Sequence, residues 1–140
     1  MIGGSAAKEV EKLRPFIEVA LLATRNGFTK NAQALFTTVL DTLLSICWEL
    51  NQEMGKKLKH RKRNEEFPAE LSDLTVRESL VWLPVWNAHL AYWPNNNDPT
   101  PHQYSRHASV QGACSAQYNQ HNCLQAAMLV CSVFPSRRLK

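Results

Sequence analysis

The stretch "TKNAQALFTTVLDTLLSICWEL", residues 29–50, determines how the rest of the chain is interpreted. Its apolar residues recur at spacings of three and four, the period of one helix face. They are Ala32, Leu35, Phe36, Val39, Leu43, Ile46 and Leu50. Thr29 stands where the capping residue of a helix is expected. We therefore predict a long amphipathic helix from Thr29 onward.

A shorter amphipathic helix is predicted just before it, between Ala6 and Thr24. Its apolar face consists of Val10, Leu13, Ile17 and Leu21. Asn26-Gly27 should end this helix, because Gly adopts the left-handed conformation at helix ends. A short connection between two amphipathic helices predicts an antiparallel hairpin whose apolar stripes face one another.

Two further helices are predicted in the second half. Thr75 and Glu78 have the spacing of a capping box, so a helix should start near Thr75, and Pro84 should kink or divide it. The last helix should end at Pro135, with His121 and Asn122 capping its start. The expected faces are Val76, Leu80, Leu83, Trp86, Leu90 and Trp93 for the first of these, and Leu124, Ala127, Met128, Cys131 and Phe134 for the last.

The expected fold class is all-α, an antiparallel helical bundle of four to five helices, since no alternating pattern of useful length predicts a strand. At 140 residues, 44% of them hydrophobic, the chain is long enough for one core, so we expect a single domain over residues 1–140. Residues 1–5 are interpreted as a cloning remnant or a disordered end. Residues 55–70 are interpreted as a basic surface connection.

Composition predicts a soluble, cytoplasmic protein with no membrane contact. The apolar runs are interrupted by polar residues well short of the roughly 20 that span a bilayer. The first residues lack the apolar run of a secretory signal. None of the four cysteines, Cys47, Cys114, Cys123 and Cys131, belongs to a C-x-x-C pair, so they are expected to be buried thiols.

The net charge of +4 is concentrated in a basic run of Lys56, Lys57, Lys59, Arg61, Lys62 and Arg63. Such a run attracts RNA through counterion release. A charge run taken in isolation is more typical of a solvated linker. The sequence leaves both interpretations open.

A polar segment, "YSRHASVQGACSAQYNQHNC" at residues 104–123, precedes the last apolar helix. Together with the "LQAAMLVCSV" that follows, it resembles the "NRHxxxHG" stretch and the Asn-led apolar helix of small helical proteins of the HEPN superfamily. The stretch "AQALFTTVLDTLL" is similar to another helix of those proteins. The resemblance is dispersed over most of the chain.

The resemblance implies a helical bundle that forms a homodimer and acts on RNA in a defence or toxin–antitoxin setting, with an antitoxin or another protein as a further partner. Many HEPN domains are metal-independent endoribonucleases, whose signature is an Arg, a polar residue and then a His. Arg106 matches the Arg and His107 the polar residue, whereas Gln111 stands where the His is expected.

This departure bears on catalysis, because an imidazole exchanges protons near neutral pH and an amide does not. In the catalytic interpretation, Arg106 clamps the scissile phosphate, His107 takes the acid–base role and Gln111 positions the substrate. In the alternative, the chain is a non-catalytic interaction or dimerisation module. Arg106 and His107 then only cap or bridge neighbouring helix ends.

No metal or cofactor is predicted. The candidate ligands His102, His107, Cys114, His121 and Cys123 fit none of the usual zinc spacings, and no phosphate-binding Gly-rich loop is present. The aromatics Trp82, Trp86, Tyr92 and Trp93 have a spacing typical of a core or a dimer interface, with stacking on RNA bases as the alternative. His89 is expected to be a partly buried, hydrogen-bonded histidine.

Overall fold

The computed structural model of the chain describes residues 4–48, 66, 76–110 and 114–134. Within these ranges the regular structure is helical, with no strand, which confirms the all-α fold class. The elements are α1 (Gly4–Glu11), α2 (Arg14–Arg25), α3 (Thr29–Trp48), α6 (Val76–Ala88), the 3-10 turn η1 (Pro94–Asn96), α7 (Arg106–Val110) and α8 (Gln120–Val133).

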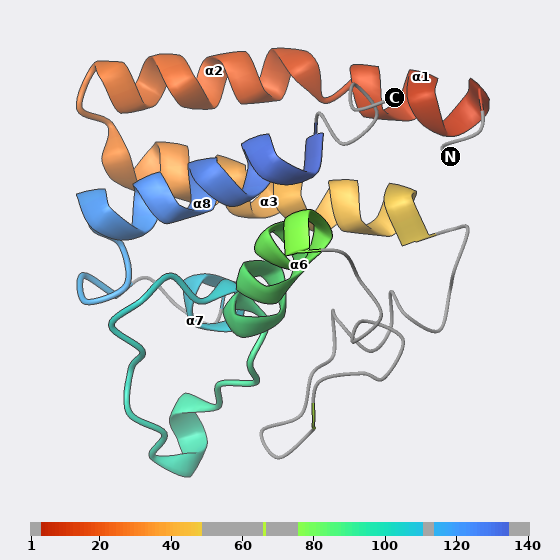
Figure 1. The fold of residues 1–140 in the computed structure, drawn as a ribbon. Helices are drawn as coiled ribbons and strands as arrows, with labels where there is room; N and C mark the ends of the chain where they lie inside the picture. Colours follow the sequence, from red (N-terminus) through yellow and green to blue (C-terminus); the bar gives the residue numbers. More distant parts are fainter. Residues whose placement is uncertain (1–3, 49–65, 67–75, 111–113, 135–140) are drawn as a thin grey trace.

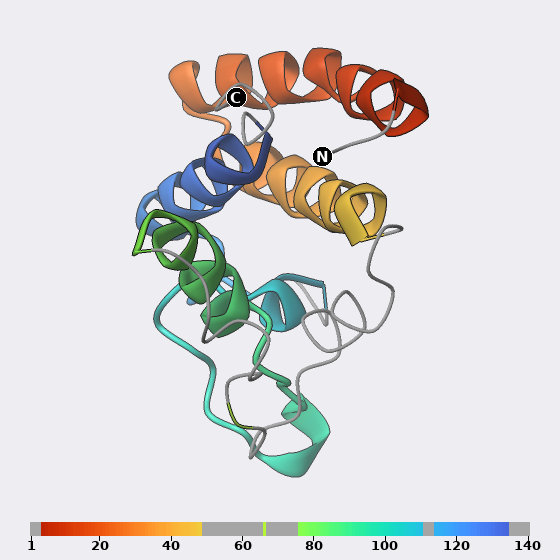
Figure 2. The same ribbon diagram turned by 45° about the vertical axis from the view of Figure 1, so that its right-hand side comes forward.

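The helices are layered around α3, which packs against α2, α7 and α8. A layer of α3 and α8 separates α2 from α7 in both ribbon views (Figure 1, Figure 2). α2 runs antiparallel to α3, as predicted, whereas α8 runs in the same direction as α3 (Figure 1). The centre of the core is fully buried and includes Phe36, Leu40, Leu43, Ala126 and Val130.

The first helical stretch is broken where one continuous helix was expected. α1 ends at Glu11, and Leu13 N–H bonds back to the Val10 carbonyl at 3.0 Å before α2 begins. Pro15 explains the break, because a residue without an N–H is tolerated only in the first turn of a helix. α1 begins at Gly4, so residues 4 and 5 lie in its first turn, while residues 1–3 lie outside the described residues.

The connection between α2 and α3 contains the predicted stop. Gly27 has a φ of +83°, in the left-handed region that favours glycine. Thr29, however, is the first residue of α3 rather than its cap, since Ala32 N–H bonds to the carbonyl of Phe28 at 3.0 Å. The predicted inner face of α3 is confirmed by four buried members: Ala32, Phe36, Val39 and Leu43.

The faces predicted for α6 and α8 are largely wrong. In α6, Val76 and Leu80 are exposed while Val85 and Trp86 are buried; the helix ends at Ala88 and Pro84 does not divide it. In α8, Leu124, Met128 and Cys131 are exposed, and the inner face is Cys123, Ala126, Ala127, Leu129, Val130 and Val133. Both helices carry apolar residues all round, so periodicity alone does not select the inner side.

The cysteines differ in burial. Cys123 is buried as expected, Cys114 is half-buried and Cys131 is exposed, while the Cys47 side chain lies outside what the structure describes. Burial raises the pKa of the Cys123 thiol. Among the described residues, no helix combines the length and apolarity needed to cross a membrane.

Candidate functional site

The polar segment begins with a short helix, α7, whose start is fixed by Ser105. Ser105 Oγ accepts a hydrogen bond from Ala108 N–H at 3.2 Å, and its carbonyl accepts from Ser109 N–H at 3.0 Å. Serine favours helix starts because its hydroxyl satisfies an amide that has no helical partner. His107, Ala108 and Ser109 are all buried, so most of α7 faces the interior.

Gln117 holds this segment from inside the protein. Its side chain is fully buried, and its Oε1 accepts from Ser105 N–H at 2.7 Å and from Ser109 Oγ at 3.4 Å. Its Nε2 donates to the carbonyls of Pro101 and Gln103 at 3.1 and 3.2 Å. An amide has two donor hydrogens and two acceptor lone pairs, so these bonds use its full capacity. The polar groups of this segment are therefore hydrogen-bonded to one another.

α3 presents a polar stripe to this segment, formed by Gln33, Thr37 and Asp41 at spacings of four residues. Gln33 Nε2 donates to the Gln117 carbonyl at 3.0 Å. Thr37 Oγ1 and Tyr104 Oη share a hydrogen bond of 2.8 Å. Burial raises the pKa of Tyr104 above its ordinary value, so this hydroxyl is protonated at neutral pH.

Arg106 binds the third member of the α3 polar stripe. Its Nε donates to Asp41 Oδ1 at 3.0 Å and its Nη2 to Oδ2 at 2.5 Å, a bidentate pair in which the planar guanidinium meets both carboxylate oxygens. The two side chains are 26% and 27% exposed. A phosphate that reached Arg106 would therefore have to compete with Asp41 for the guanidinium.

His107 lies beneath the surface. It is 8% exposed, and its ring centroid lies 6.3 Å from that of Trp93 in an edge-to-face arrangement, with 70° between the planes. Trp93 is half-exposed and covers this side of the imidazole. Proton transfer between His107 and a bound RNA would require the ring to become accessible.

His89 is the second buried histidine, and it terminates α6. Its Nδ1 donates to the Val85 carbonyl at 2.8 Å, while its Nε2 is buried and has no hydrogen-bond partner among the described residues. Burial lowers the pKa of His89 to about 4, opposed by the Val85 hydrogen bond and the nearby Asp41 carboxylate and assisted by Arg106 and His107. The imidazole is therefore neutral at pH 7 and only half satisfied.

The four aromatic residues singled out in the sequence differ in burial. Trp86 is buried and Trp82 packs against the core, which confirms the core interpretation for these two. Tyr92 Oη lies within hydrogen-bond distance, 3.2 Å, of Thr100 Oγ1. Trp93 remains half-exposed beside His107, so its surface is available to a partner.

Several predicted site residues lie outside the described part of the chain. Gln111 belongs to the stretch 111–113 and the basic run to the stretch 49–65. Their roles in positioning and in RNA binding stay predictions. Of the proposed catalytic set, the structure places Arg106 and His107, which are adjacent in the sequence but differ in their surroundings.

A hollow of about 390 Å³ is lined in part by Asp41, the partner of Arg106. Its walls include the hydroxyl-bearing side chains of Thr37, Thr38, Thr42 and Ser45. Each of these four hydroxyls donates its hydrogen to the carbonyl four residues earlier in α3, so none of them offers a donor to a phosphate or a sugar oxygen. In the described ranges no group of three or more His, Cys, Asp or Glu side chains could hold a metal ion.

Three residues that organise the site were not anticipated: Asp41, Gln117 and Asn119. The spacing of Gln33, Thr37 and Asp41 on an otherwise apolar helix is the signal for the α3 polar stripe. Asn119, rather than His121 or Asn122, caps α8, because Asn119 Oδ1 accepts from Asn122 N–H at 2.9 Å. Nothing comparable in the sequence points to Gln117, whose side-chain partners lie in the loop before α7 and in α7 itself.

Comparisons with protein-family models, with curated proteins and with solved structures find no match to this chain. The HEPN resemblance therefore rests on the residues of the chain itself and stays a prediction.

Proposed function

We propose that the chain is a non-catalytic helical interaction module that forms a homodimer through α2. The observation that carries this proposal is an exposed apolar stripe on α2, formed by Phe16, Val19 and Leu22. These side chains are 53%, 58% and 57% exposed and recur at every third position. Contiguous apolar surface of this kind is typical of interaction sites.

The packing of α2 supports this proposal. The inner side of the helix packs on α3 through Ile17 and Ala20, so the exposed stripe is a second apolar face. A surface helix of a monomer normally carries polar residues on its outer side. Phe28 is 62% exposed and lies in the α2–α3 connection, so it adds apolar surface near the C-terminal end of α2.

The surroundings of the Arg106 segment favour the same conclusion. Arg106 is engaged by Asp41, His107 is buried, and an amide at position 111 exchanges no protons near neutral pH. A dimer through α2 would also keep the two Arg106 segments apart, because the α3–α8 layer separates α2 from α7 (Figure 1, Figure 2).

Sedimentation velocity over a range of concentrations tests this proposal. We expect the parent chain to dimerise and a Val19→Glu/Leu22→Glu variant to stay monomeric, since two buried charges without partners oppose association. Leu124→Glu is the matched control, because Leu124 is 57% exposed but lies on α8; it should dimerise like the parent. A parent that is monomeric throughout, or a double variant that still dimerises, would contradict the proposal.

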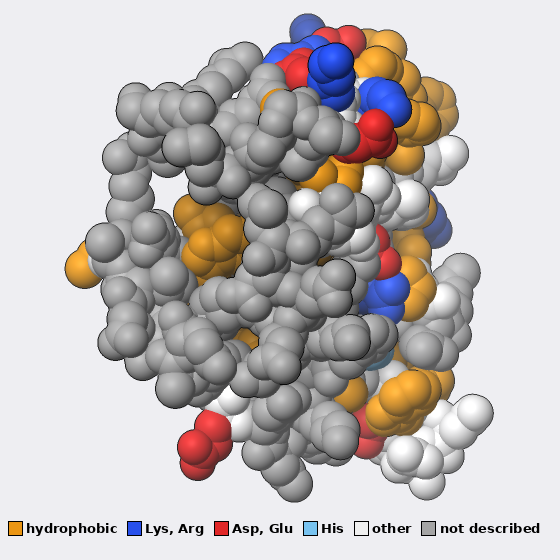
Figure 3. Space-filling view, turned by 90° about the vertical axis from the view of Figure 1, so that its right-hand side faces the viewer, with side chains coloured by type: hydrophobic (Ala, Val, Ile, Leu, Met, Phe, Trp, Pro, Cys, Tyr) orange, Lys and Arg blue, Asp and Glu red, His pale blue; other side chains and the backbone are white. Residues whose placement is uncertain are grey.

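The second candidate is an RNA-directed function, as a cytoplasmic, metal-independent endoribonuclease of HEPN type or an impaired derivative in a defence or toxin–antitoxin setting. The quarter-exposed Arg106, which stands at the position of the signature arginine, favours it. On the face shown in Figure 3, described basic and acidic side chains lie next to one another, so no purely basic patch is present among them. Near α1, Lys12 pairs with Glu9 and Arg14 with Glu11. RNA affinity would therefore come from the predicted basic run.

Cleavage of mixed RNA in EDTA tests this candidate. The parent is compared with Arg106→Ala, with Gln111→His and with the control Arg25→Ala, which removes an exposed arginine from α2. The interaction-module proposal predicts no cleavage by any of the four. Cleavage by the parent that is lost only in Arg106→Ala would establish the nuclease, and activity that appears only in Gln111→His would identify an impaired site.

A further inference from the structure

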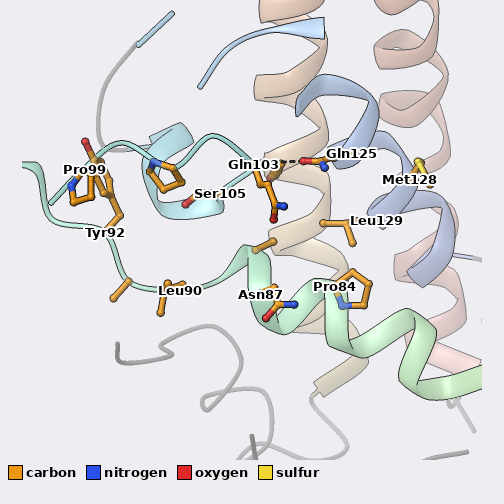
Figure 4. A pocket seen from close by; sticks show the side chains of 14 residues that line it. Pro84, Asn87, Leu90, Tyr92, Pro99, Gln103, Ser105, Gln125, Met128 and Leu129 are labelled. Carbon is orange, nitrogen blue, oxygen red and sulfur yellow. Dashed lines mark hydrogen bonds between the residues drawn. The ribbon is translucent and has the colours of Figure 1, made fainter. Parts of the chain in front are cut away.

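A pocket of about 570 Å³ opens between α6, α8 and the loop that joins α6 to α7 (Figure 4). Its volume lies within the range typical of small-molecule sites, roughly 300–1,000 Å³. The apolar wall comes from three parts of the chain: Pro84 of α6, Leu90, Tyr92 and Pro99 of the loop, and Met128 and Leu129 of α8. Met128 is exposed rather than packed in the core, and its side chain lines this pocket.

The chemistry of the wall restricts the ligand. None of the described residues that line the pocket is Asp, Glu, Lys, Arg or His. A charged ligand would lose its hydration here without meeting an opposite charge, which is costly. The pocket therefore suits an uncharged molecule with a largely apolar body.

Two hydrogen-bond donors line the same pocket. Ser105 is 5% exposed, and its Oγ accepts from Ala108 N–H, while no described residue accepts its hydroxyl hydrogen. Gln125 Oε1 accepts from Tyr104 N–H at 2.8 Å, which fixes the orientation of the amide. Among the described residues, no acceptor is bonded to its Nε2. Each side chain therefore retains a donor that a ligand acceptor can satisfy.

We propose that this pocket binds a small, uncharged, mainly apolar molecule with one carbonyl-type acceptor, held by Gln125 Nε2–H. The proposal is independent of dimerisation and of RNA. Ser105 lines the pocket and also fixes the start of α7, so an occupied pocket would stabilise the start of that helix.

The test uses benzophenone as a probe and diphenylmethane, which has nearly the same shape but no acceptor, as its matched partner. Binding is followed by ¹H–¹⁵N NMR. We expect benzophenone to shift the Gln125 side-chain amide and the Tyr104 backbone amide in a saturable way. Diphenylmethane should bind roughly threefold to tenfold more weakly, the ratio expected for one net hydrogen bond.

Variants locate the site and test its donor. Ala91→Trp, which fills the pocket, should weaken benzophenone binding at least roughly tenfold, a loss equivalent to about 1.4 kcal/mol. Ala34→Trp, the same change in the hollow that Ala34 lines on α3, should leave it unchanged. Gln125→Glu keeps an acceptor for Tyr104 N–H but removes the donors, so it should abolish the preference for benzophenone.

Circular dichroism on each variant verifies that the fold is intact before binding is compared. The proposal would be overturned by the absence of saturable binding to the parent chain, by equal affinity for the two probes, or by binding that Ala34→Trp blocks and Ala91→Trp does not. If Ala91→Trp does not fold, the two-probe comparison on the parent and on Gln125→Glu still decides.

Discussion

The side chains around α7, where it meets α3, differ in their bonding from those on the outer face of α2. Around α7, Gln117, Gln33 and Arg106 have hydrogen-bond partners inside the chain. On α2, Val19 and Leu22 are more than half exposed. Arg106, which the sequence singled out as a catalytic candidate, is thus bonded within the chain, whereas the apolar Val19 and Leu22 are left at the surface.

This contrast indicates where a partner would act. Side chains already bonded within the chain contribute to a complex only after those bonds are exchanged, which costs free energy. Apolar surface in contact with water gains free energy when a partner covers it. The α2 stripe is therefore a better candidate for an interaction surface than Arg106.

The largest expected effect is the loss of Gln117. Gln117→Ala would leave Ser105 N–H and the Pro101 and Gln103 carbonyls without partners inside the protein. We expect a loss of about 4 kcal/mol in the free energy of unfolding in urea. Gln120→Ala, at an exposed position of α8, is the matched control and should change little. Equal effects of the two changes would contradict the buried network.

The next largest effect is a pH dependence from His89. Because burial lowers its pKa to about 4, the unfolded chain binds a proton between pH 6.5 and 4 that the folded chain does not. Stability should therefore fall as the pH falls through this window, by roughly 3 kcal/mol between pH 7 and pH 4. His89→Gln should flatten the urea-unfolding profile over that range. A profile as steep as that of the parent would assign the effect to other groups.

A smaller effect is expected at the start of α8. Asn119→Ala removes the oxygen that accepts from Asn122 N–H, and the loss of such a cap costs about 1 kcal/mol. Asn119→Ser retains a capping oxygen and should recover most of this loss in thermal unfolding. Failure of the serine variant to recover stability would show that Asn119 does not act as a cap.

The smallest effect on stability is expected on α2. At concentrations where the chain is monomeric, Val19→Glu should change the unfolding free energy by no more than about 0.5 kcal/mol, because the side chain is exposed. A loss of several kcal/mol would mean that Val19 is part of the monomer core, which would remove the distinction between the two regions.

Local patterns in the sequence predicted the parts of the fold that depend on near neighbours. The inner face of α3 and the stop at Gly27 follow from residues within a few turns of one another. The inner faces of α6 and α8 do not, because apolar residues surround both helices and tertiary packing selects the buried side. The break before α2 was readable in Pro15 but was not anticipated.

The site was less predictable, because its contacts join distant parts of the chain. Asp41 and Arg106 are 65 residues apart, and Gln33 and the Gln117 carbonyl 84. The sequence singled out Arg106 as a functional residue, but no local pattern gives its partner. The roles of Arg106, His107 and Gln111 in RNA cleavage stay predictions.

The central claim is that Arg106 stabilises the fold by joining α7 to Asp41 of α3. Its most direct test is a double-mutant cycle in urea unfolding with Arg106→Ala, Asp41→Ala and the double variant. For a bidentate pair that is one-quarter exposed, we expect a coupling free energy of about 1 kcal/mol, reduced by added salt. A coupling indistinguishable from zero, with neither single change affecting stability, would contradict the structural role of Arg106.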